Sequence, residues 1–275
     1  YAWVAYGSQG RQELSLHSDQ DNALILDDGV DTAGATYFAQ LASQVCDGLA
    51  ACGFMHCPGE MMATNPRWRL PLSAWHAEFG DWFTDTDPQK ARLAANLFDL
   101  RLVHGEVRLA QSLRRQICVE GPRQPSLLVY LVANGCRKAP PLGFFRQFVV
   151  DRSGEHAGQL DLKCHGLMPI VDLARTCALA AGVAEVGTVA RLQAARGSRL
   201  LSQAGADTLL AAFEFLQRLR SHHHLEQLHR GLPADNFVAP ESLSAHERKH
   251  LRDVFLAIAT QQQGLLQAFP QARIR

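Results

Sequence analysis

The sequence predicts an α+β fold, with a small head built from a mixed sheet and helices and a mostly α-helical domain after it. In the first part of the chain, short apolar runs that stop at Gly or Asn-Pro are interspersed with segments of helical periodicity. Beyond residue 88, helical periodicity dominates. Two breaks that contain proline, between residues 121 and 125, mark a joint. We therefore expect a head at residues 1–120 and a helical domain at residues 121–275.

Three strands and four helices are expected in the head. The first strand stops at Gly7-Ser8, the second follows a polar cluster that ends at Asn22, and the third stops at Asn65-Pro66. The expected strands cover residues 2–6, 23–26 and 61–64, and the expected helices cover residues 36–51, 72–83, 90–103 and 107–118.

The helical domain is expected to contain one hairpin and a series of helices. An apolar run at residues 127–133 is followed by the breaker Ala139-Pro140-Pro141. The turn residues Ser153-Gly154 predict a hairpin between residues 144–150 and residues 159–163. Ser244 and Glu247 have the spacing of a capping box at the start of the last helix. The four expected helices cover residues 169–181, 188–195, 206–228 and 244–269.

The composition is that of a globular protein and excludes several classes. The chain has 275 residues, of which 47% are hydrophobic, and its 27 basic residues balance 27 acidic ones. Zero net charge argues against a nucleic-acid partner or a polybasic membrane binder. The longest apolar runs are too short to cross a bilayer. Seven scattered cysteines without a CxxC pair indicate a reduced, cytoplasmic location. The start without Met, inside an expected strand, indicates a fragment of a longer protein.

The segment from Gly7 to Arg11 has the residue types of a phosphate-binding turn. A helix that starts near Ser8 would direct its free N–H groups at an anion. Gly10 would let the backbone approach a bulky anion closely. The Ser8 hydroxyl and the Arg11 guanidinium could donate further hydrogen bonds to the same oxygens.

Asp19 and Asp21 follow at the entry to the second strand. Side chains at i and i+2 lie on one face of a strand. Two carboxylates on one face form a site for Mg²⁺, which binds through few carboxylates plus substrate phosphates. A phosphate-binding turn beside two metal-binding aspartates is what nucleotidyl transfer with two cations requires.

The stretch from Gly7 to Leu26 resembles the Gly-Ser … Asp-x-Asp signature of the DNA-polymerase-β-like nucleotidyltransferase superfamily. It looks most like the nucleotidyltransferases found in bacteria behind cyclic-nucleotide-binding and CBS domains, which are relatives of the uridylyltransferases that modify PII signalling proteins. The resemblance covers nearly the whole chain and implies a polymerase-β-like head with the family's helical domain. It is supported by Cys57-Pro58-Gly59 and by residues 62–68, 98–106, 141–145, 160–163, 169–175 and 233–236.

The resemblance implies roles for the residues that match the signature. Asp19 and Asp21 would bind two Mg²⁺ ions, and Gly7, Ser8 and Arg11 would hold the triphosphate of an NTP. The superfamily usually adds a third carboxylate, on a later strand, that activates the acceptor hydroxyl. The candidates are Glu60, where the family more usually has glycine, Asp99, and Asp161 with Lys163 beside it to neutralise phosphate.

Each of these residues also has a structural interpretation. Asp19 and Asp21 could cap a strand, and Arg11 could be an ion-pair partner, with Glu13 as one such partner. For Asp99 and Arg101 we favour the structural interpretation, because leucines surround them at core-like spacing. Asp161 and Lys163 fit a hairpin pair as well as a site.

Three other features are interpreted as structural. Adjacent histidines on a helix point in different directions, so we interpret His222-His223-His224 as a solvated helix face. Trp68, Trp75, Phe79 and Trp82 are expected in the core, although Trp68 could stack on a base. The cysteines are interpreted as small core residues.

Two functions follow from these observations. The first is a Mg²⁺-dependent nucleotidyltransferase that moves NMP from an NTP to an acceptor, with UTP and a protein acceptor suggested by the uridylyltransferase kinship. The second is a catalytically degenerate module that binds nucleotide and signals to upstream sensor domains. The position of the third carboxylate distinguishes them.

Overall fold

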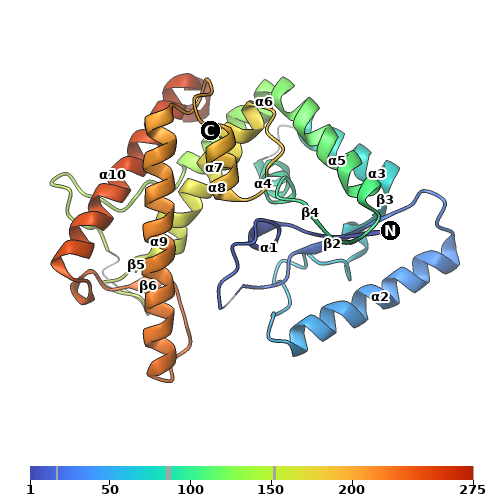
Figure 1. The fold of residues 1–275 in the computed structure, drawn as a ribbon, viewed down its shortest axis with the longest axis horizontal. Coiled ribbons are helices and arrows are strands. Elements are labelled where there is room, and N and C mark those ends of the chain that lie inside the picture. Colours follow the sequence, from blue (N-terminus) through green and yellow to red (C-terminus); the bar gives the residue numbers. More distant parts are fainter. Residues whose placement is uncertain (17, 85–87, 151–152, 275) are drawn as a thin grey trace. The chain divides into compact units, whose positions relative to one another are not determined.

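The computed structural model describes residues 1–16, 18–84, 88–150 and 153–274 (Figure 1). The chain forms two compact units, of which the first comprises Tyr1–Leu127 with Gly182–Gly187 and the second Leu128–Ala181 with Thr188–Arg275. The predicted α+β class is confirmed, because a small mixed sheet with helices is joined to a helical C-terminal part.

The first unit is organised around a four-stranded sheet. Its strands are β1 (Ala2–Ala5), β2 (Asn22–Leu26), β3 (Arg69–Pro71) and β4 (Arg101–Gly105), in the order β3-β2-β1-β4. Strand β1 pairs antiparallel with β2 and β4, and β2 pairs parallel with β3. Every residue of β1 and β2 is buried, which explains why, apart from Asn22, their sequences are apolar without alternation.

Among the described residues, the α-helices of the first unit are α1 (Gly7–Gly10), α2 (Thr32–Ala51), α3 (Leu72–Thr84), α4 (Pro88–Leu97) and α5 (Val107–Glu120). Helix α3 buries Trp75, Phe79 and Trp82, and the ring of Trp68 stacks on that of Trp75 with centroids 6.2 Å apart. The expected core role of these aromatic residues is therefore confirmed.

The second unit is a helical assembly with one short sheet. Strand β5 (Leu160–Asp161) pairs antiparallel with β6 (Phe237–Val238). Ser244 and Glu247 form the predicted capping box at the start of the last helix. Its helices are α7 (Met168–Ala180), α8 (Thr188–Ala194), α9 (Gln203–His229), α10 (Ala245–Ala268) and most of α6 (Pro125–Cys136), which begins in the first unit. A π-helical turn at Lys163–Leu167 leads into α7.

Short 3-10 helices connect several elements of both units. They cover Pro66–Trp68, Gly121–Arg123, Pro240–Ser242 and Pro270–Ile274. Among the described residues, no helix combines the length and the apolar content that a membrane crossing takes.

Three expectations about elements were wrong. The third strand is Arg69–Pro71 rather than residues 61–64, because the Met61 carbonyl accepts hydrogen bonds from the Tyr6 hydroxyl and the Asn22 amide and the segment forms turns. The helix expected at residues 90–103 ends at Leu97, and a turn leads into β4. Leu97, Leu100 and Leu102 are three and two residues apart, and this spacing suits either a helix or a strand. Periodicity alone therefore could not place the C-terminal end of the helix.

The hairpin expected between residues 144–150 and 159–163 does not form. Residues 141–149 fold back on themselves through an isolated bridge between Leu142 and Phe148. Leu160–Asp161 pairs instead with Phe237–Val238, a partner far along the chain. A short apolar run does not specify its partner strand, so the sequence suggested only the nearest one.

Candidate metal and nucleotide site

The entry to β2 is held in place by the residues that alternate with the two aspartates. Gln20 and Asn22 are buried, at 1% and 0% exposure. The Gln20 Nε2 donates to the carbonyls of Cys46 and Phe54 at 2.9 and 2.8 Å. The Asn22 Oδ1 accepts from the Ala63 amide at 2.9 Å. These bonds anchor one face of the segment and leave Asp19 and Asp21, both half-buried, on the other.

A potential metal-binding group lies on that face. Among the described residues, Asp19, Asp21 and Cys57 each offer a ligand atom, and these atoms all lie within 4.8 Å of one another. Burial, together with the nearby charge of Asp21, raises the pKa of the Cys57 thiol to about 11. A neutral thiol is a weak ligand, so the hard donors of the group are the two carboxylates. This donor set fits a divalent cation of the Mg²⁺ type.

Gly7 provides the space beside the Asp21 carboxylate. Its backbone φ is +57°, a left-handed conformation that favours glycine. A Cβ at this position would lie 2.6 Å from the Asp21 Oδ2. Glycine at position 7 therefore permits both the left-handed turn after β1 and the close approach of the Asp21 carboxylate to the start of α1. Ser8 follows and is partly exposed.

Gly10 has a different environment from the one expected. It is buried, and a Cβ there would lie 2.1 Å from the Asp99 carbonyl oxygen and 2.9 Å from that of Ala5. Close packing against backbone explains this glycine without a phosphate. Helix α1 has only four residues, so the helix-dipole contribution expected from a longer helix is small.

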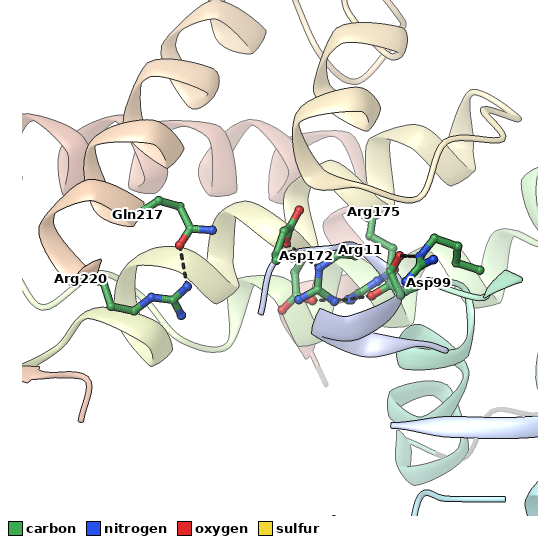
Figure 2. Close-up of polar contacts among 9 residues, drawn as sticks. Arg11, Asp99, Asp172, Arg175, Gln217 and Arg220 are labelled. Carbon is green, nitrogen blue, oxygen red and sulfur yellow. Dashed lines mark hydrogen bonds and ion pairs between the residues drawn. The ribbon is translucent and has the colours of Figure 1, made fainter. Parts of the chain in front are cut away.

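Arg11 forms ion pairs with two carboxylates, those of Asp99 and Glu13, and Figure 2 shows its side chain beside Asp99. Its Nη1 donates to the Asp99 carboxylate and its Nε to the Glu13 Oε2 at 2.8 Å. The side chain of Asp99 has no exposed surface, and Arg11 is 8% exposed. The ion-pair interpretation of Arg11 and Glu13 is thus confirmed, and the predicted contact of Arg11 with a triphosphate stays a prediction.

Asp99 and Arg101 have structural roles, as favoured from the sequence, but the partners differ. Asp99 lies in the turn between α4 and β4 rather than on a helix, and it pairs with Arg11. Arg101 donates to the carbonyls of Gly10 and Gln9 at 3.0 and 3.1 Å, the last carbonyls of α1. A cation at a helix C-terminus satisfies carbonyls that have no partner within the helix.

Glu60 is exposed and has a backbone φ of +52°, which a residue other than glycine rarely adopts. We expect Glu60→Gly to stabilise the first unit by up to about 1 kcal/mol, because the left-handed backbone then carries no Cβ. Chemical denaturation followed by tryptophan fluorescence measures this change. Glu60→Ala removes the carboxylate but keeps the Cβ, so it should leave the stability unchanged. Equal stabilisation by both variants would contradict the backbone explanation.

Asp161 and Lys163 belong to the second unit. The Asp161 Oδ1 accepts from the Cys164 amide at 2.8 Å and so caps the π-helical turn before α7. Lys163 is exposed at the first position of that turn. Their contribution to catalysis and to phosphate binding stays a prediction.

The histidine run on α9 does not form a shared site in the part of the chain that the structure describes. The Nε2 of His222 lies 3.4 Å from Glu226 and that of His223 lies 3.1 Å from Asp235. His224 is 4% exposed, so the solvated-face interpretation was wrong for this residue. The described residues close enough to hold a metal together are those around Asp21, not these histidines.

Sequence reasoning missed two neighbours of the aspartates. Cys57 is buried in a hydrophobic cluster, so its interpretation as a core residue is confirmed. Its position beside the two aspartates was not predicted, although the Cys57-Pro58-Gly59 stretch already supported the family resemblance. Tyr6 was seen only as the end of a strand. Its hydroxyl donates to the Met61 carbonyl at 2.5 Å, and burial, with a smaller effect of the Asp21 charge, raises its pKa. Tyr6 therefore stays protonated and ties the end of β1 to the loop that carries Cys57.

The fold and the acidic pair define a nucleotidyltransferase-type protein, and comparison with family models agrees. Residues 1–89 match the family described as putative nucleotidyltransferase DUF294, and residues 125–269 match the putative nucleotidyltransferase substrate binding domain. The chain belongs to this nucleotidyltransferase family. No curated protein matches the chain.

Proposed function

We propose that the chain transfers NMP from an NTP to an acceptor in a reaction that depends on Mg²⁺. The observation that carries this proposal is the pair Asp19 and Asp21, whose carboxylates lie together on one face of the entry to β2, against Gly7. The family matches support the general class of activity. By the uridylyltransferase kinship, UTP and a signalling protein are the proposed donor and acceptor.

In this proposal each group has one task. Asp19 and Asp21 hold the cations, which neutralise the charge on the phosphates when bound. The triphosphate is positioned by Gly7, Ser8, Gly10 and Arg11, and Arg11 does so while it is paired with Asp99 and Glu13. Lys163 offers a further positive charge. An acceptor oxygen then attacks the α-phosphorus, the bond to the bridging oxygen breaks, and pyrophosphate leaves. Asp161 is the proposed catalytic carboxylate that receives the acceptor proton.

The positions of the other candidate carboxylates in the first unit favour the second candidate, a module that binds nucleotide without transferring it. In the first unit, Asp99 is engaged by Arg11, and Glu60 is outside the group that Asp19 and Asp21 form with Cys57. Strand β3, with the sequence Arg-Leu-Pro, carries no carboxylate. If Asp161 does not serve as the base, the chain would act as a regulatory nucleotide-binding module coupled to upstream sensor domains.

Calorimetry with UTP, ATP, GTP and CTP, with Mg²⁺ or with EDTA, tests both candidates. We expect one nucleotide to bind only with Mg²⁺, and the Asp19→Asn/Asp21→Asn variant to lose this binding. The control variant Asp47→Asn/Asp81→Asn removes two exposed carboxylates elsewhere in the first unit and should bind normally. Non-hydrolysable analogues separate binding from turnover.

Transfer is then measured with an NTP labelled at the α-phosphate, offered to cell lysate. Label on an acceptor that requires the two aspartates supports the transferase. Tight Mg²⁺-dependent binding without any labelled product supports the regulatory module. If the folded chain binds no NTP, both candidates are wrong.

A further inference from the structure

Lys138 and Cys164 make a short contact between an ammonium and a sulfur. The Lys138 Nζ lies 2.7 Å from the Cys164 Sγ. Five other hydrogen bonds to or from sulfur among the described residues, which involve Cys46, Cys118, Cys136, Cys177 and Met62, measure 3.4–3.8 Å. The Nζ–Sγ separation of Lys138 and Cys164 is thus shorter by at least 0.7 Å than these five hydrogen bonds.

Both backbones that carry this contact are held in place. The Lys138 carbonyl, just beyond the end of α6, accepts from the Gln262 Nε2 at 3.0 Å, and Gln262 is 3% exposed. The Cys164 amide donates to the Asp161 Oδ1 at 2.8 Å. Because the two backbones are anchored independently, the short separation does not depend on one flexible loop.

The pair is also within reach of solvent. Lys138 is exposed and Cys164 is half-buried, whereas Cys46, Cys57 and Cys177 are buried. Reactive cysteines are in general partly exposed and lie beside cationic side chains. Cys164 has both properties.

We propose that Lys138 and Cys164 form an oxidation-dependent cross-link in which one oxygen atom joins Nζ to Sγ. A peroxide first oxidises the sulfur, so that its O–O bond breaks, S–H becomes S–OH and one water leaves. The Lys138 ammonium releases one proton to solvent. A second peroxide then accepts two electrons while the N–O bond forms, and two waters leave. The product is N–O–S, with sulfur and nitrogen oxidised and two peroxides reduced.

The cross-link would join the end of α6 to the turn that begins α7 and close the chain between residues 138 and 164. Closing a loop of this size lowers the conformational entropy of the unfolded chain, as a disulfide does. We expect oxidation to raise the melting temperature of the second unit by roughly 10 °C. A thiol reductant should reverse the rise.

Peptide mapping by mass spectrometry tests the proposal on the full chain treated with hydrogen peroxide. The expected product links the peptides of Lys138 and Cys164, with a mass greater than their sum by one oxygen less two hydrogens. Trypsin should no longer cleave after Lys138, and dithiothreitol should restore both peptides. Neither Lys138→Arg, which keeps the positive charge, nor Cys164→Ser should give the product.

Two controls make the result decisive. Cys136→Ser removes the cysteine closest to Lys138 in sequence and should still give the cross-link. Cys52 is exposed and reports that peroxide oxidises accessible thiols under the same conditions. If Cys52 is oxidised while Cys164 gives only its own oxygen adducts, or a direct N–S bond without the added oxygen, the proposal is wrong.

Discussion

Replacing Arg11 with methionine is expected to destabilise the first unit by about 3–5 kcal/mol. Methionine fills much of the same space but makes no ion pair with Asp99 or Glu13, and the side chain of Asp99 has no exposed surface. Chemical denaturation followed by tryptophan fluorescence measures the loss. All four tryptophans belong to the first unit, so this signal reports on the unit that holds the ion pair.

The double variant Arg11→Met/Asp99→Leu provides the stringent comparison. Replacing both partners of a buried ion pair by apolar residues is often neutral. The double variant removes the charge of Asp99 but keeps Glu13, the second partner of Arg11, so it should regain part of the lost stability. The exposed pair of Arg108 with Asp27 is the matched control, and Arg108→Met should cost little. A double variant no more stable than Arg11→Met would contradict the ion-pair explanation.

The same double variant separates the two roles considered for Arg11. If Arg11 only supports the turn after β1, the refolded double variant should bind NTP as tightly as the unaltered chain. If the guanidinium also contacts the triphosphate, affinity should fall even though the fold is restored. Titration of both proteins with the nucleotide found by calorimetry gives the answer.

The part of the site that is local in sequence could be predicted, and the rest could not. The spacing of Asp19 and Asp21 placed both on one face, and the structure brings their carboxylates together. Cys57 and Asp99 reach their partners only through the folded chain; Asp99 is 88 residues from Arg11. No periodicity or motif connects residues so far apart, so their contacts follow from tertiary packing alone.

The fold shows the same division. The strands β1 and β2 and most helices were predicted because apolar pattern and stop residues act locally. The third strand was predicted at residues 61–64, but this apolar run forms turns. Its Met61 carbonyl accepts hydrogen bonds from the Tyr6 hydroxyl and the Asn22 backbone amide. Strand β5 was predicted, but its partner β6, which follows α9, was not.

Replacing Gly10 with alanine is expected to destabilise the first unit by about 3 kcal/mol or more. The new Cβ would lie 2.1 Å from the Asp99 carbonyl oxygen and 2.9 Å from that of Ala5. Both atoms belong to backbone, one in the turn before β4 and one at the end of β1, so neither can rotate away as a side chain would. Relief requires α1 to move off the sheet, and α1 carries Gly7 and Ser8. Tryptophan fluorescence during denaturation again measures the loss.

Gly48→Ala is the control for this substitution. Gly48 lies within α2, is exposed, and a Cβ there would meet nothing within 4 Å. Alanine should therefore stabilise that helix by about 1 kcal/mol, the opposite sign to Gly10→Ala. Because α1 would move, Gly10→Ala should also weaken NTP binding at temperatures where the protein is still folded. If Gly10→Ala keeps full stability but loses nucleotide, Gly10 serves the phosphates and not the packing against Asp99.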